Sequence, residues 1–93
     1  MANPRNANHI DAHIGRYLRK SRKRANLTQT ELADALGITF QQIQKYERGA
    51  NRVSASRLWD ICKVLNKMPN DFFQIDNNGE NDNGPDSPLS VNL

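Results

Sequence analysis

The sequence of 93 residues has little cysteine, few aromatic residues and no long apolar run. Its single cysteine, Cys62, can form no internal disulfide and, by itself, no zinc site. No apolar run approaches the roughly 20 residues that a membrane-spanning helix needs, and the N-terminal residues lack the apolar stretch of a secretory signal. We therefore expect one small soluble domain in a reducing compartment, the cytoplasm, without a membrane partner.

Residue sets that support catalysis or metal binding are also missing. The sequence shows no Ser/His/Asp or Cys/His pattern for nucleophilic catalysis and no glycine-rich phosphate loop. His9 and His13 are four residues apart, a spacing that suits two metal ligands on one helix face, but the nearby Asp11 would point elsewhere on a helix and no other third ligand is evident. We therefore expect no enzymatic activity, no metal, no cofactor and no small-molecule ligand.

Positive charge is absent from the last part of the chain. Residues 76–93 contain four acidic residues and no lysine or arginine, whereas residues 1–75 hold all 13 basic residues and the other six acidic ones. The first part therefore carries a net charge of +7 and the last part a net charge of −4. A basic body of this kind is typical of proteins that bind a polyanion such as nucleic acid.

Composition divides the chain into three segments. Residues 1–8 show no periodicity and are expected to form a flexible N-terminal arm. Residues 76–93 are rich in Asn, Gly, Pro, Ser and acidic residues, and only three of them are apolar. Such a segment cannot bury enough apolar surface to offset the entropy lost on ordering, so we expect a disordered acidic tail. The folded domain is then residues 9–75.

Apolar residues recur with a helical period throughout this domain, which predicts an all-α bundle of four to five short helices. A first helix, which ends near Ala25, is marked by one apolar stripe: Ile10, Ile14, Tyr17 and Leu18. A fourth helix, which has Ser54 as its N-cap, is marked by another: Leu58, Ile61, Cys62 and Leu65. Asn70 is expected to cap a last short turn, in which Phe72 and Phe73 close the core.

Capping signals place two further helices in the middle of the chain. Thr28 and Glu31 form a capping box, in which the threonine hydroxyl accepts the Glu31 amide N–H and the glutamate reaches back to Thr28. Gly37 ends this second helix where the chain needs a positive φ. Thr39 repeats the signal, with glutamine in place of glutamate, to begin a third helix that Gly49 closes. So short a link forces the two helices to cross steeply, as in a helix-turn-helix.

Residues 14–73 resemble the phage-repressor-like (Cro/CI-type, XRE) helix-turn-helix family. The resemblance is carried by Leu27-Thr28-Gln29-Thr30-Glu31-Leu32-Ala33, Leu36-Gly37-Ile38-Thr39, Ile43 and Tyr46-Glu47-Arg48-Gly49. It implies a lambda-repressor-like DNA-binding domain of bacterial or phage origin that binds operator DNA as a homodimer and regulates transcription. We expect a repressor that binds an inverted repeat with half-sites about 34 Å apart.

The third helix, residues 39–48, is expected to enter the major groove of double-stranded DNA. Ile43 and Tyr46 would face the core, which leaves four side chains to read bases: Phe40, Gln41, Gln44 and Lys45. Glutamine can pair with adenine through two hydrogen bonds, lysine can donate to guanine, and phenylalanine can contact a thymine methyl group.

Residues around this helix are expected to contact phosphates: Arg22, Thr28, Gln29, Thr39, Asn51 and Arg52. Gln29 begins the second helix, where free amides and the helix dipole favour an anion. The resemblance assigns the same contact to this glutamine. It also implies an ion pair in which Glu47 orients Arg22 towards a phosphate.

Some alternatives stay open at this point. The basic residues of the first helix, Arg22 apart, fit a solvated helix face as well as a DNA contact. Trp59 either caps the core or anchors a dimer contact within residues 54–73, the expected dimer surface. The same fold could also serve as a protein-interaction module, such as an antitoxin, whose binding need not depend steeply on salt. A weaker idea is that residues 76–93 fold back onto the basic face.

Overall fold

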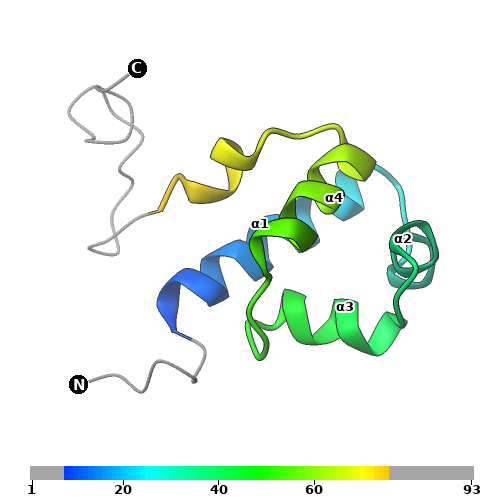
Figure 1. The fold of residues 1–93 in the computed structure, drawn as a ribbon, viewed down its shortest axis with the longest axis horizontal. Coiled ribbons are helices and arrows are strands. Elements are labelled where there is room, and N and C mark those ends of the chain that lie inside the picture. Colours follow the sequence, from blue (N-terminus) through cyan, green and yellow to red (C-terminus); the bar gives the residue numbers. More distant parts are fainter. Residues whose placement is uncertain (1–7, 76–93) are drawn as a thin grey trace.

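The computed structural model describes residues 8–75, which form a small helical bundle (Figure 1). Its elements are α1 His9–Arg24, α2 Gln29–Leu36, α3 Phe40–Glu47, α4 Ala55–Leu65 and the 3-10 helix η1 Pro69–Phe73. This part of the chain contains no strand, so the all-α prediction is confirmed. None of its helices is long and apolar enough to cross a membrane.

The first helix begins with a side-chain cap of its own. Asn8 was assigned to the flexible arm, but it is the N-cap of α1, and its side chain accepts the amide N–H groups of Ile10 and Asp11 at 2.9 and 3.2 Å. The Asp11 carboxylate accepts the Asn8 amide in return, which completes a capping box. The remaining predictions for residues 1–7 and for the tail, residues 76–93, fall outside the described residues.

The predicted caps set the bounds of α2 and α3. The Thr28 hydroxyl accepts the Glu31 amide at 3.0 Å, and Glu31 accepts the Thr28 amide at 2.8 Å, so this capping box is confirmed. The Thr39 hydroxyl accepts the Gln42 amide at 3.2 Å, which is the first half of the box only. Gly37 has φ +72° at the end of α2, as the turn requires.

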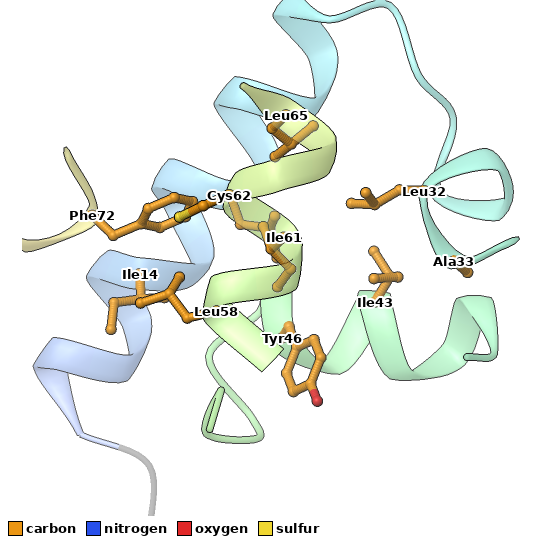
Figure 2. Close-up of a cluster of buried hydrophobic side chains, with 11 residues drawn as sticks. Ile14, Leu32, Ala33, Ile43, Tyr46, Leu58, Ile61, Cys62, Leu65 and Phe72 are labelled. Atoms are coloured by element: carbon orange, nitrogen blue, oxygen red, sulfur yellow. The ribbon is translucent and has the colours of Figure 1, made fainter. Parts of the chain in front are cut away.

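The core lies among α1, α2, α3, α4 and η1, each of which contributes buried side chains (Figure 2). Five large side chains are almost completely buried: Leu18, Leu32, Ile43, Ile61 and Phe72. The Phe72 ring meets Tyr17 edge to face at a centroid distance of 4.7 Å. In Figure 1, α3 runs along one edge of the bundle, and the loop that follows it returns to α4.

The expectation for the last turn is wrong in two respects. Asn70 is not the cap, because η1 already begins at Pro69, and the Met68 amide before it donates to the Asp71 carboxylate at 2.9 Å. A proline at the first position has a suitable φ and needs no hydrogen-bond acceptor there, which moves the start of the helix forward. Phe72 closes the core as predicted, whereas Phe73 is 36% exposed.

Two glycines allow the backbone of α1 to approach the end of α3 closely. A Cβ atom on Gly15 would lie 2.8 Å from the Glu47 carbonyl oxygen and would also overlap the carbonyl oxygen of Tyr46. Gly49 has φ +72°, and a Cβ atom there would lie 2.8 Å from the Ala12 Cα. The backbones of α1 and of the end of α3 are therefore in direct contact, which fixes how α3 is presented.

Candidate nucleic-acid interface

The outer side of α3 presents the side chains expected to read bases. Ile43 and Tyr46 are buried at 0% and 6% exposure, so the predicted orientation of the helix is confirmed. The opposite side carries the other four residues, of which Gln44 is half-buried and the rest are exposed: Phe40, Gln41, Gln44 and Lys45. Phe40, at 41% exposure, is the large apolar side chain that α3 leaves in water.

A buried ion pair holds α3 against α1. The Arg22 Nε donates to Glu47 Oε2 at 2.6 Å and its Nη2 donates to Oε1 at 3.1 Å, so the pair is bidentate. Arg22 also donates from Nη1 to the Leu27 carbonyl at 2.8 Å, and both members of the pair are buried. The predicted Arg22–Glu47 pair is therefore present, whereas a phosphate contact by Arg22 stays a prediction.

The same carboxylate also fixes the beginning of α2. Gln29 donates from Nε2 to Glu47 Oε1 at 3.1 Å, which links α2 to the ion pair between α1 and α3. The three elements surround an open hollow of about 140 Å³ at the surface, lined by Arg19, Gln29, Gln44, Glu47 and Arg48. The structure thus brings Gln29, which is expected to contact a phosphate, beside Gln44, which is expected to read a base.

Arg19 and Arg48 were missed as site residues by the sequence interpretation. Arg19 was counted with the solvated face of α1, and Arg48 was read as the end of the third helix and as part of the family resemblance. Both are exposed at the rim of the hollow. The available signal was spacing, because Arg19 lies three residues before Arg22, and Arg48 lies four residues after Gln44.

The remaining expected phosphate residues lie at helix starts and in the loop after α3. Thr28 and Thr39 are both exposed caps, and each hydroxyl that accepts an amide still has its own O–H to donate. The backbone N–H of Asn51 donates to the backbone carbonyl of Lys45 at 3.3 Å, so the loop folds back on α3. Arg52 Nε lies 3.0 Å from Asp11 Oδ2, an ion pair that ties the loop to α1.

Two titratable side chains away from this surface have shifted pKa values. Burial, and secondarily the charge of Arg16, lowers the pKa of His13, whose Nε2 atom is buried without a hydrogen-bond partner. Burial, and secondarily Asp71, raises the pKa of the Cys62 thiol, which packs in the core as the apolar stripe predicted. Within residues 8–75 there is no group of three or more side chains that could hold a metal ion.

Comparisons with known proteins point to one family. A helix-turn-helix family model (HTH_3) matches residues 18–72. A transcriptional regulator in the ATPase CF(0) region of Rhodospirillum rubrum, itself uncharacterized, is 53% identical over 72 residues, which cover 77% of this chain and 66% of that protein. An uncharacterized HTH-type transcriptional regulator of Sinorhizobium fredii is 50% identical over 70 residues, which cover 75% and 49%. The chain thus spans about half to two thirds of these relatives.

The fold is also similar to that of a solved helix-turn-helix protein. The restriction-modification controller protein C.AhdI from Aeromonas hydrophila superposes with a TM-score of 0.64 at 27% sequence identity. The match covers 68% of this chain and 96% of that chain. The arrangement of helices found here is therefore one that a small regulatory protein also uses.

Proposed function

Because the chain belongs to the helix-turn-helix family HTH_3, we propose that it is a sequence-specific DNA-binding regulator of transcription in the cytoplasm. Each subunit of a homodimer places α3 in the major groove at one half of an inverted-repeat operator, and binding there represses the gene. The protein acts by binding, and its chemistry is that of hydrogen bonds and ion pairs with double-stranded DNA.

The observation that carries this proposal is the hollow in which Gln44 and Gln29 lie together, beside the buried Arg22–Glu47 pair. Base edges in the major groove and the phosphates beside it have a fixed spacing, so a protein that reads sequence must hold both kinds of contact in register. Hydrogen bonds from Arg22 and Gln29 to one carboxylate hold α1, α2 and α3 in such a register.

In this proposal, the exposed side of α3 reads the bases. Gln41 and Gln44 pair with adenines, Lys45 donates to a guanine, and Phe40 contacts a thymine methyl group. The exposure of Phe40 supports this role. Covering an exposed apolar side chain with DNA removes its surface from water, which is favourable in free energy. Specificity therefore depends on residues 40–45.

Phosphate contacts surround the base-reading residues. The proposed contacts are Arg22, Thr28, Gln29, Thr39, Asn51 and Arg52, to which the hollow adds Arg19 and Arg48. Glu47 does not touch DNA, because a free carboxylate would repel a phosphate; it neutralises Arg22 and positions Gln29. These contacts supply affinity and orientation without sequence information.

The dimer is proposed to form through residues 54–73. In Figure 1, η1 lies on the far side of α1 and α4 from α3, so a partner bound there leaves α3 free for DNA. Trp59 is 58% exposed and does not cap the core, which supports the second of its two expected roles, the dimer contact. Two-fold symmetry then places the two copies of α3 about 34 Å apart, one turn of B-DNA.

Selection from a pool of random DNA, followed by a salt titration on the selected sequence, tests the proposal. We expect an inverted repeat and a log-log salt slope of several units, because each neutralised phosphate contributes about −0.9 to the slope. A reporter gene placed behind the selected site should lose expression when the protein is present. If no DNA sequence is enriched, or if the protein binds a protein partner with an affinity that hardly depends on salt, the interaction-module alternative is favoured instead.

A further inference from the structure

An apolar surface around Trp59 has no role in DNA reading. Three exposed side chains gather where α4 meets η1, namely Trp59, Met68 and Phe73, at 58%, 67% and 36% exposure. They border two adjoining hollows, both lined in part by Trp59 and Pro69. The first, of about 340 Å³, is lined further by Cys62, Lys63, Asn66, Lys67 and Met68. The second, of about 450 Å³, is lined further by Ile14, Val53, Ala55, Leu58 and Phe73.

We propose that the end of the acidic tail, residues 88–93, occupies these hollows in the same chain. The tail is polar except for Leu89, Val91 and Leu93, which alternate with Ser90 and Asn92. In an extended segment, side chains at every second position point to one side, so these three form a single apolar edge. An apolar edge of this length fits two adjoining apolar hollows better than open solvent.

The chain outside the described residues is long enough for this contact. The described part ends at Ile75, two residues after Phe73, and Phe73 itself lines the second hollow. The 12 residues from 76 to 87 form a linker with an average span of about 19 Å if it is flexible. A segment tethered in this way has an effective concentration of the order of 1 mM at the hollows, so even weak contacts hold it.

Charge favours the tail over a second copy of the chain at this surface. Lys63 and Lys67 line the first hollow, and the tail carries acidic residues just before its apolar edge: Glu80, Asp82 and Asp86. Asp60, 3.5 Å from Lys63, neutralises only part of this charge. A symmetric contact through the same hollows would bring the lysines of both copies together, which costs energy.

Tail docking also has a consequence that rests on the proposed function. The hollows lie within residues 54–73, the proposed dimer surface, so the docked tail and a second subunit compete for the same side chains. The tail then opposes dimerisation and holds operator affinity below that of a chain without the apolar edge. The docking itself requires no DNA and can be tested without it.

Trp59 is the one tryptophan of the chain, so acrylamide quenching of its fluorescence reports directly on the hollows. The full chain is compared with the variant Leu89→Ser, Val91→Ser, Leu93→Ser, over a range of protein concentrations. If the tail binds with an affinity near its effective concentration, it is docked about half of the time, and the variant's quenching constant is about twofold larger. The matched control is Ser90→Ala, Asn92→Ala, which keeps the apolar edge and should be quenched like the original chain.

Three outcomes separate the possible occupants. Protection of the full chain that persists at the lowest concentration, and that the Leu/Val variant lacks there, supports the tail, whether or not the variant regains protection at higher concentration by dimerising. Protection that disappears on dilution and survives the triple substitution identifies a second copy and overturns the proposal. Equal quenching in both chains at every concentration shows uncovered hollows and overturns it as well. Because no DNA is present, each outcome is independent of whether the chain binds an operator.

Discussion

Arg22 and Glu47, which are 25 positions apart in the sequence, form a buried bidentate ion pair with a shortest N–O distance of 2.6 Å. The pair joins the last turn of α1 to the end of α3, and Gln29 at the start of α2 binds the same carboxylate. Burying two charges is costly unless they compensate each other, so each partner depends on the other. This relationship links the stability of the domain to the presentation of its base-reading helix.

Removing one partner of this pair should be strongly destabilising. We expect Glu47→Ala to lower the free energy of unfolding by about 3–5 kcal/mol, because Arg22 then keeps a buried charge without compensation. Urea denaturation measures this. The double variant Arg22→Met, Glu47→Leu should recover most of the stability but bind DNA more weakly, since Gln29 loses its acceptor and the proposed phosphate contact of Arg22 is removed. If the double variant binds DNA like the original chain, the pair serves packing alone.

Sequence preference should depend on two glutamines of α3. Gln41→Ala with Gln44→Ala should cost about 1–3 kcal/mol for each lost base pairing on the selected operator. Binding to a scrambled sequence should change little, so the ratio of the two affinities falls. Gln42→Ala on the same helix is the matched control, because Gln42 is not among the base-reading residues. An unchanged affinity ratio in the double variant would refute the assignment.

Arg52 should contribute to affinity without contributing to specificity. We expect Arg52→Ala to weaken binding to all sequences alike and to reduce the salt slope by about 1. Its ion pair with Asp11 allows a control, because Asp11→Asn removes the pair but keeps the arginine. If Asp11→Asn weakens binding as much as Arg52→Ala, then the arginine acts by anchoring the loop to α1 instead of contacting a phosphate.

The sequence predicted those parts of the fold that depend on neighbouring residues. A capping box involves residues three positions apart, and Gly37 ends α2 through its own φ, so both could be read locally. The apolar stripe of α4 was likewise correct, and that of α1 was correct for Ile14, Tyr17 and Leu18, because a helix with one buried face must repeat its apolar residues. Ile10, in the first turn of α1, was wrongly included, because it is 37% exposed. Asn70 failed as a cap because the neighbouring Pro69 had the stronger preference for the first helical position.

The site was less predictable where it depends on how α1 crosses α3. Arg22–Glu47 was inferred from the family resemblance and not from spacing, since 25 positions carry no local signal. Arg19 and Arg48 share a hollow only because α1 and α3 meet there. That close crossing requires Gly15, and a glycine inside a helix was the one local sign of it.

Gly15→Ala should therefore destabilise the domain, although alanine is favoured over glycine in a helix interior by about 1 kcal/mol. The added Cβ atom would overlap the backbone carbonyl oxygens of Tyr46 and Glu47, which cannot move without shifting α3. We expect a net loss of about 1–3 kcal/mol in the free energy of unfolding, measured with urea. Gly37→Ala meets nothing within 4 Å and should cost only the strain of its φ of +72°, about 1 kcal/mol. A Gly15→Ala chain as stable as the original would show that α1 and α3 are less closely packed.

The stability of the domain should fall in weak acid in part because of His13. Burial lowers the pKa of this histidine below its ordinary value of 6.5, and the charge of Arg16 lowers it further. The unfolded chain therefore takes up a proton more readily than the folded one. The stabilising contribution is complete above pH 6.5 and is lost as the pH falls from there towards the folded-state pKa.

We expect His13→Gln to reduce this loss, so that urea midpoints decline less steeply below pH 6.5 than those of the original chain. His9→Gln is the matched control, because His9 is an exposed histidine on the same helix. The acidic residues are the same in all three chains, so the difference between the curves isolates His13. A decline that is unchanged in His13→Gln, or that is reduced equally in His9→Gln, would contradict this role of burial.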